Sequence, residues 1–227
     1  MNHRLLRYFV VAFISIVCGV TPLRASETCP DCGSVSGSIQ VWKTKVKTKG
    51  AKSARDVLVY LEPVGGEPSP PGTTQVSMDQ LGLVFLPHVL AVQKGTTVTF
   101  LNSDHVDHNV YFLFERTGET LDIGTWGYGI SKTYQFNDPG PVITLCKLHL
   151  EMAAHILVLD NPFFTLTQIE EGPQKALYAI KNVPPGNYTL KTWHKKLKMK
   201  GLSVPITVQS RQETHQNIVI TKTKYAK

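Results

Sequence analysis

The sequence of 227 residues lacks several patterns that mark large classes of proteins. No segment has the periodicity of a long amphipathic helix, and short strand-like runs alternate with turn residues instead, so we expect an all-β protein. No base-reading motif accompanies the basic residues, which argues against nucleic acid as a partner. The 8 histidines offer too few suitable pairs for an oxidase that reduces dioxygen, and no hydrolytic arrangement is found. An enzyme is therefore not expected.

The chain also has no apolar run long enough to span a membrane comfortably. The stretch from Tyr8 to Val20 is too short for that purpose. It follows Arg4 and Arg7 and precedes an imperfect cleavage site, Leu23-Arg24-Ala25, and this order predicts a secretory signal over residues 1 to 25. A retained anchor is the alternative. We expect a periplasmic or otherwise exported protein, soluble after signal cleavage and without stable membrane insertion.

The positive charge is moderate and uneven. Without the three arginines of the signal, the formal charge falls from +7 to +4. Basic residues crowd two segments, where they are interpreted as solvated strand edges that block unwanted pairing. The alternative is a surface that steers an acidic partner. These residues are Lys43, Lys45, Lys47, Lys49, Lys52 and Arg55 in one segment, and Lys195, Lys196, Lys198 and Lys200 in the other.

Cysteine is scarce, and one of the 4 cysteines stands in a pattern of soft metal ligands. Cys146, His149 and Met152 follow one another at intervals of three residues, directly after the strand-like segment Val142 to Leu145. A type 1 copper site needs one thiolate and two imidazoles, often with a weak axial thioether. Taken singly, each residue has a plainer interpretation, because cysteine and methionine commonly fill cores.

The second imidazole is expected upstream. His108 begins the sequence His-Asn-Val and follows the alternating strand pattern Thr97 to Phe100, and a sandwich can bring this segment beside Cys146. His105 is the main rival, but it lacks the following Asn-Val and lies closer to the preceding strand. A short ligand loop between two strands is held at both ends by hydrogen bonds, so its ligands would move little when copper changes oxidation state. This arrangement favours fast electron transfer.

The pattern resembles that of the cupredoxins over roughly residues 75 to 160. The ligand loop is similar to those of plastocyanin-type and amicyanin-type proteins, and His108-Asn109-Val110 resembles their N-terminal ligand motif. The resemblance implies a Greek-key β-sandwich that holds one mononuclear copper ion. It also implies equatorial and axial ligands, which are His108, Cys146 and His149 in the plane and Met152 on the axis.

The C-terminal part resembles a second family. The run Val183-Pro184-Pro185-Gly186-Asn187-Tyr188-Thr189-Leu190 is similar to the turn and strand of carboxypeptidase regulatory-like, transthyretin-like sandwiches, over about residues 165 to 222. The whole order resembles bacterial exported proteins labelled plastocyanin-like or methylamine-utilisation-like. Many of these carry asparagine after the copper cysteine and tryptophan before the methionine, where this chain has Lys147 and Glu151. The surface around the copper and the reduction potential therefore do not follow from the resemblance.

We expect four parts along the chain. They are the signal peptide at 1–25, a Cys-x-x-Cys segment at 26–34, a cupredoxin domain with N-terminal strands at 35–160, and a smaller regulatory-like β-sandwich at 161–224. Residues 35–64 also resemble the opening of the second kind of sandwich, so the sequence leaves open which domain they join. The glycine-rich and threonine-rich segment from Leu113 to Ile130 is expected to form a long connection over one face.

Signal cleavage would leave three cysteines, an odd number for an exported protein. A local disulfide between Cys29 and Cys32 leaves Cys146 for copper, and this is the pairing we favour. The alternative is a pair that accepts Cu(I) or a thiol partner. No histidine follows Cys32, so covalent haem attachment is not indicated.

These observations predict an exported type 1 (blue) copper protein that carries one electron by cycling between Cu(II) and Cu(I). Its partners would be exported redox proteins such as a cytochrome or a dehydrogenase, and His149 would be the electron exit. The alternatives are a periplasmic copper storage or delivery protein, and a metal-free β-sandwich scaffold whose apparent ligands fill a core.

Overall fold

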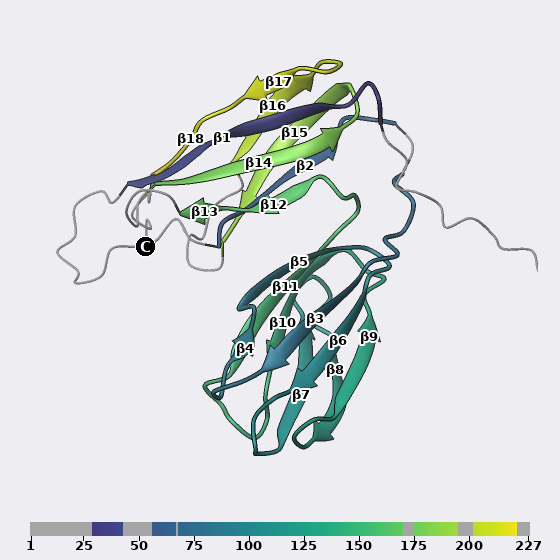
Figure 1. Ribbon diagram of the computed structural model, residues 1–227, viewed down its shortest axis with the longest axis vertical. Helices are drawn as coiled ribbons and strands as arrows, with labels where there is room; N and C mark the ends of the chain where they lie inside the picture. The colour runs from purple at the N-terminus through teal and green to yellow at the C-terminus, as the bar shows by residue number, and fades with distance from the viewer. Residues whose placement is uncertain (1–28, 43–55, 67, 170–174, 195–201, 222–227) are drawn as a thin grey trace, which may run out of the picture.

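The computed structural model describes residues 29–42, 56–66, 68–169, 175–194 and 202–221. Every helix or strand assigned within these ranges is a β-strand, so the predicted all-β fold is confirmed. The strands form two sandwiches, drawn one above the other in Figure 1. No helix in the described ranges is long and apolar enough to cross a membrane. The predicted signal peptide and both lysine-rich segments lie outside the described residues.

One sandwich, the lower in Figure 1, is built from a single stretch of chain, residues 75–159. Its first sheet has the order β4-β3-β6-β9, and its second sheet has the order β5-β11-β10-β7-β8. The strands of the first sheet are β3 (Gln75–Gln80), β4 (Phe85–Leu86), β6 (Thr97–Asn102) and β9 (Ser131–Gln135). Those of the second are β5 (Val89–Gln93), β7 (His108–Phe114), β8 (Thr120–Trp126), β10 (Gly140–Leu145) and β11 (Ala153–Leu159).

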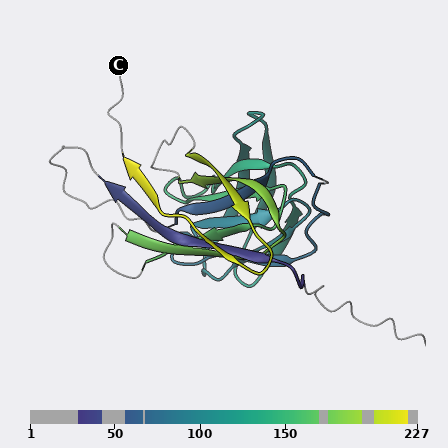
Figure 2. The same ribbon diagram turned by 90° about the horizontal axis from the view of Figure 1, so that it is seen from above.

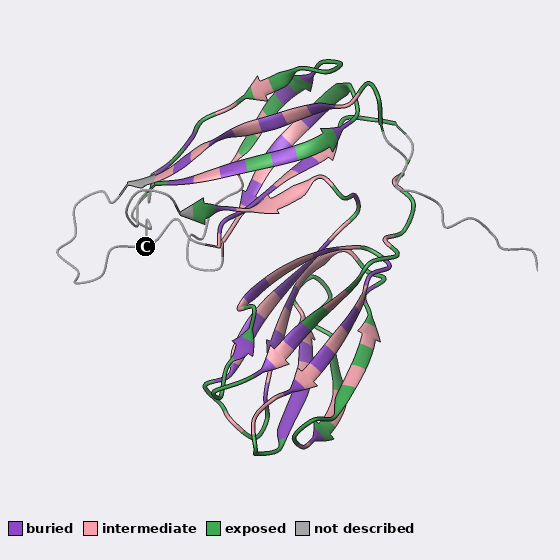
Figure 3. Cartoon of the chain, in the orientation of Figure 1, coloured by how far each residue is buried: buried purple, intermediate pink, exposed green. Residues whose placement is uncertain are grey.

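Alternation of apolar and polar residues explains how these strands form a core. In β6, Val98 and Phe100 are fully buried while Thr97 and Thr99 are half-buried, because successive side chains of a strand point to opposite faces. Figure 3 shows this banding along the strands. Between the sheets, the ring of Phe112 lies 5.4 Å from those of Phe100 and Phe136, centroid to centroid. Cys146 and Met152 belong to the same buried cluster.

The upper sandwich combines strands from two distant parts of the chain. One sheet has the order β13-β14-β1-β17, with β18 also paired to β1, and the other has the order β12-β2-β15-β16. The strands of the first are β1 (Gly33–Trp42), β13 (Gln168–Ile169), β14 (Lys175–Val183), β17 (Glu213–His215) and β18 (Ile218–Thr221). Those of the second are β2 (Leu58–Pro63), β12 (Phe164–Leu166), β15 (Gly186–Trp193) and β16 (Ser203–Val208).

The first two strands lie in this upper sandwich. β1 runs antiparallel to β14 and parallel to β18, so that Ile39 stands opposite Ala176 on one side and Ile218 on the other. Figure 2 shows β1, β14 and β18 side by side. β2 pairs antiparallel with β15. These pairings place the two described strands of residues 35–64, β1 and β2, in the C-terminal sandwich.

The expectation of a long connection from Leu113 to Ile130 is wrong. The segment contains β8, which pairs antiparallel with β7. β8 lies at the edge of its sheet, and its first three residues are exposed. Leu121 and Ile123 alternate with polar residues, but this pattern is short and is interrupted at Gly124, where the register with β7 shifts. The strand signal in the sequence is therefore weak.

The two sandwiches meet through a small apolar cluster. Leu58, Val89 and Leu157 are buried in it, so β2 of the upper sandwich packs against β5 and β11 of the lower one. The ring of His155 on β11 also lies 5.5 Å from that of Trp193 on β15, measured between centroids. Partly buried residues surround the cluster: Tyr60, Ala91, Leu159, Phe164, Leu166 and Trp193.

Candidate metal centre

Three ligand atoms converge where two paired strands meet the same end of their sheet. β10 ends at Leu145 and Cys146 follows it, while β7 begins at His108. The two strands are antiparallel neighbours, so the sheet brings Cys146 beside His108, and His149 comes from the loop that joins β10 to β11. The Sγ of Cys146 lies 4.0 Å from the Nδ1 of His108 and 3.7 Å from the Nδ1 of His149. The two Nδ1 atoms are 3.1 Å apart.

This triangle of atoms has the size that a metal ion requires. The circle through its three corners has a radius of about 2.1 Å, so one point in the plane lies about 2.1 Å from every ligand atom. Zinc, which is close to copper in size, binds imidazole nitrogen at about 2.0–2.1 Å and thiolate sulfur at about 2.3 Å. One thiolate and two imidazoles in a trigonal plane are the donor set of type 1 copper. The residues therefore fit a single copper ion.

A carboxylate fixes the orientation of the His108 ring. The Nε2 of this fully buried histidine lies 2.8 Å from an Oδ2 of Asp104. An ionised carboxylate can only accept a hydrogen bond, so in the neutral ring the proton sits on Nε2 and the Nδ1 lone pair faces Cys146 and His149. Two backbone N–H groups, first that of Leu83 and then that of Gly82, together with the His108 ring, hold the pKa of Asp104 below its usual value.

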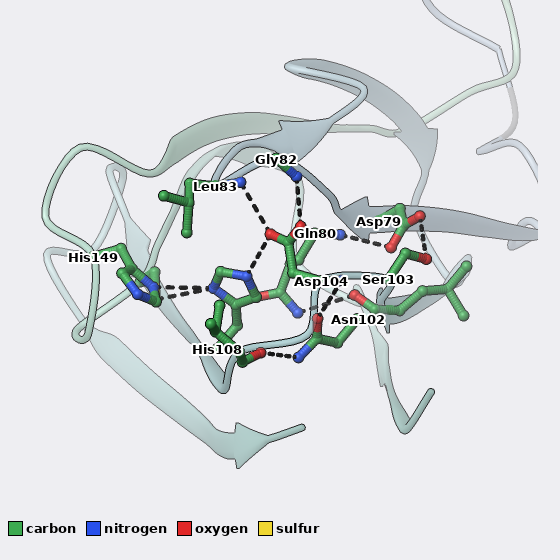
Figure 4. Close-up of polar contacts among 12 residues, drawn as sticks. Asp79, Gln80, Gly82, Leu83, Asn102, Ser103, Asp104, His108 and His149 are labelled. Atoms are coloured by element: carbon green, nitrogen blue, oxygen red, sulfur yellow. Dashed lines mark hydrogen bonds and ion pairs between the residues drawn. The ribbon is translucent and has the colours of Figure 1, made fainter. Parts of the chain in front are cut away.

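Asp104 is itself anchored by the turn between β3 and β4. The backbone N–H of Leu81 donates to the carbonyl of Val84, and Gly82 and Leu83 have φ of 69° and 59°. Positive φ at both central residues is the geometry of a type I′ hairpin turn, which is unfavourable for leucine. The N–H groups of Gly82 and Leu83 donate to the Asp104 carboxylate over 2.7 and 2.9 Å. Figure 4 shows Asp104 between this turn and the His108 ring.

The sulfur of Cys146 is shielded and receives a hydrogen bond. Cys146 is only 3% exposed, and the backbone N–H of Asn109 points to its Sγ at 3.4 Å. The side-chain Oδ1 of Asn109 accepts the N–H of Lys147 at 3.3 Å, and its Nδ2 donates to the carbonyl of Gly124. Asn109 therefore ties the two ligand-bearing segments together. A donor aimed at the sulfur stabilises a thiolate.

The ligand loop closes on itself through the backbone. The N–H of Met152 donates to the carbonyl of His149 at 3.0 Å, and the N–H of Cys146 donates to the carbonyl of Met152 at 3.3 Å. Met152 is buried in the same cluster as Cys146, and its role as the axial ligand stays a prediction. The loop is thus anchored at both ends, as its position between β10 and β11 requires.

The rival histidine lies apart from the three ligands. His105 is exposed, and its ring stacks on that of Tyr128 with centroids 4.3 Å apart. The structure brings together His108, Cys146 and His149, the one such group of candidate ligands among the described residues. Sequence reasoning missed Asp104 and the turn at Gly82 and Leu83. The available signal was the position of an aspartate four residues before the ligand histidine.

The predicted disulfide between Cys29 and Cys32 is present, and it lies away from this centre. Cys29 and Cys32 are bonded in the turn that precedes β1, in the upper sandwich. The turn is also held by Arg211, whose guanidinium donates to the Asp31 carboxylate and to the carbonyl of Pro30 at 3.0 Å each. Cys146 is the free cysteine of the described residues.

Copper proteins of known structure, amicyanin among them, are similar to this chain over about 44% of its length. A Cu-containing nitrite reductase (NirK) from Thermus scotoductus SA-01 is 25% identical, with a TM-score of 0.37, and the match covers 44% of this chain and 26% of that chain. The chain thus spans about a quarter of that reductase. An amicyanin variant in its Cu(I) form is 21% identical, with a TM-score of 0.36, over 44% of this chain and 99% of that one.

A purple cupredoxin from Nitrosopumilus maritimus is 20% identical, with a TM-score of 0.33, over 37% of this chain and 99% of that one. No protein-family model matches the chain, and no curated protein matches it.

Proposed function

We propose that this chain binds one copper ion through His108, Cys146 and His149, with Met152 as a weak axial ligand, and that it serves as a one-electron carrier. The observation that carries the proposal is the triangle of one sulfur and two nitrogens whose centre lies about 2.1 Å from each atom. Bound copper would supply the chemistry, the exchange between Cu(II) and Cu(I).

The protein holds these ligand atoms in place from several sides. Asp104 fixes the ring of His108, the Asn109 N–H fixes the sulfur, and the hydrogen bonds of the loop fix His149 relative to Met152. Ligands that are held so firmly move little when the charge of the site changes. Fast electron exchange is favoured over the ligand loss that rapid metal delivery requires, which supports the carrier function.

His149 is the expected electron exit. Among the three ligands of the triangle it alone is not fully buried, and the neighbouring Leu148 and Leu150 are 52% and 89% exposed. Further exposed apolar side chains come from loops whose backbone groups are hydrogen-bonded to Asp104 or Asn102. These are Leu81, Leu83, Val84 and Leu86 around the first turn, Val106 beside Asp107, and Tyr128 and Ile130 after β8. We propose that these side chains form one apolar surface, because such patches are typical of protein docking sites.

We propose that an exported redox protein, such as a cytochrome or a dehydrogenase, docks on this apolar surface. We further propose that the chain works outside the cytoplasm. The sequence of residues 1–25 supports export, and the Cys29–Cys32 disulfide agrees with an oxidising compartment.

The decisive experiment is the optical spectrum of the full chain after loading with Cu(II), with bound copper quantified. We expect one copper per chain and an intense band near ~600 nm that bleaches on reduction. The band should vanish in Cys146→Ser, while Cys29→Ser/Cys32→Ser, which removes the other two cysteines of the described residues, should keep it. Bound copper without the band would favour storage or delivery. Failure to bind stoichiometric copper would favour the alternative function, a metal-free β-sandwich scaffold.

A further inference from the structure

An ion pair stands beside the candidate metal centre. The Nζ of Lys147 lies 2.7 Å from an Oδ2 of Asp122. Lys147 directly follows Cys146, and Asp122 lies on β8 opposite Tyr111 of β7. The ammonium group also sits 4.8 Å from the centre of the Tyr111 ring. The pair therefore joins the ligand loop to the neighbouring edge strand.

Hydrogen bonds connect this pair to the ligand sulfur. The other carboxylate oxygen of Asp122 accepts from the side-chain Nδ2 of Asn109 at 2.9 Å and from the backbone N–H of Gly124 at 2.7 Å. Asn109 in turn accepts the backbone N–H of Lys147 and donates its own N–H to the Sγ of Cys146. Lys147 is thus linked to Cys146 along the backbone, as its neighbour in sequence. Asp122 is linked to the Cys146 sulfur through the hydrogen bonds of Asn109.

Stability does not account for the pair. The side chains of Lys147 and Asp122 are 53% and 36% exposed, and ion pairs as exposed as this one contribute little to folding. Both charges are nevertheless held in fixed positions. The hydrogen bond from Lys147, followed by that from Asn109, holds the pKa of Asp122 below its usual value, so the carboxylate stays ionised.

We propose that Lys147 and Asp122 are positioning residues whose opposed charges balance each other beside copper held at Cys146, so that either charge without the other would shift the reduction potential. This inference rests on the proposed function. Reduction from Cu(II) to Cu(I) adds one negative charge to the site. The ammonium of Lys147 stabilises the reduced site, the carboxylate of Asp122 stabilises the oxidised site, and in the native pair the two effects largely cancel.

The test is a set of charge variants of the full copper-loaded chain. Lys147→Met leaves the Asp122 carboxylate without its opposite charge and should lower the midpoint potential. Asp122→Asn leaves the Lys147 ammonium without its opposite charge and should raise the midpoint potential. We expect roughly a threefold change in the ratio of Cu(II) to Cu(I) affinity in each, because exposed charges act through a high effective dielectric. For one electron this equals about 28 mV. The double variant should return to the native potential, and Lys147→Arg should retain it.

Two measurements distinguish an effect of charge on the midpoint potential from an effect of structural damage. Both single shifts should shrink as salt concentration rises, because exposed charges are screened, while the position of the ~600 nm band should stay unchanged. Lys191→Met, which breaks the comparable exposed pair with Glu62 in the upper sandwich, should leave the potential alone. Single variants that shift in the same direction, or that do not shift at all, would overturn the inference. Absence of the band in the native chain would instead overturn the proposed function.

Discussion

Asp104 accepts a hydrogen bond from the Nε2 of His108 over 2.8 Å, and the same carboxylate receives the backbone N–H groups of a turn on another strand pair. One aspartate therefore holds both a candidate metal ligand and the hairpin between β3 and β4. Its two roles make it the strongest candidate for mutation among the residues that do not themselves reach the metal.

We predict that Asp104→Asn weakens Cu(II) binding by about 10–100-fold, the usual effect of losing a partner that orients a metal ligand. The amide would present either a donor or a weaker acceptor to His108. A competition titration with a copper chelator measures the change. Asp107→Asn is the matched control, because Asp107 is exposed, lies in the same loop and is outside the cluster of three ligands. Equal affinities in the two variants would contradict this role for Asp104.

A second prediction separates the two candidate histidines. His108→Gln should abolish the intense ~600 nm band, because it removes one of the three trigonal ligands. His105→Gln should retain the band, since the His105 ring is exposed and stacks on Tyr128. The optical spectrum of each copper-loaded variant decides the matter. A band that survives in the His108 variant and disappears in the His105 variant would reverse the ligand assignment.

A third prediction concerns the axial position. Met152→Leu conserves the volume of a buried side chain, so it should lower the free energy of unfolding by less than about 1.5 kcal/mol. The band should persist, because the trigonal ligands are unchanged. The midpoint potential should rise, since an apolar side chain in place of the thioether disfavours the more highly charged Cu(II). Voltammetry measures this shift, and an unchanged potential would argue against Met152 as a ligand.

A fourth prediction concerns the disulfide. Cys29→Ser/Cys32→Ser should cost at most about 2 kcal/mol of unfolding free energy, because the bond closes a very short loop. The contacts of Arg211 with Pro30 and Asp31 would still hold the turn. Urea denaturation followed by tryptophan fluorescence measures the cost, while the copper spectrum should not change. A loss of bound copper in this variant would mean that the pair takes part in metal binding.

The grouping of His108, Cys146 and His149 could be predicted from the sequence because it depends on local order. Cys146 and His149 share one short loop after an apolar strand, and His108 opens another strand, so the chemistry of the side chains and their spacing suffice. The support of Asp104 could not be predicted in the same way. Its partners, Gly82 and Leu83, stand more than twenty residues earlier, and the contact depends on the parallel pairing of β3 with β6.

The fold shows the same division. The apolar residues of β6 and β10 gave their positions, whereas the alternation in β8, an edge strand, is short and is interrupted at Gly124 by a register shift. The partners of β1 could not be read locally either, because β14 and β18 lie more than a hundred residues downstream. Choosing between two sandwiches for residues 35–64 required those long-range pairings.

The pairing of β2 with β12 has a consequence for how the protein is made. The backbone N–H of Leu61 donates to the carbonyl of Phe163, so the chain leaves the upper sandwich and re-enters it at adjacent points. The lower sandwich is in effect an insertion within its neighbour. During synthesis all of its strands emerge before β14 to β18, which β1 and β2 need as partners. The inserted domain can therefore complete its fold first, whereas β1 and β2 cannot pair with all their partner strands until the C-terminal strands have been synthesised.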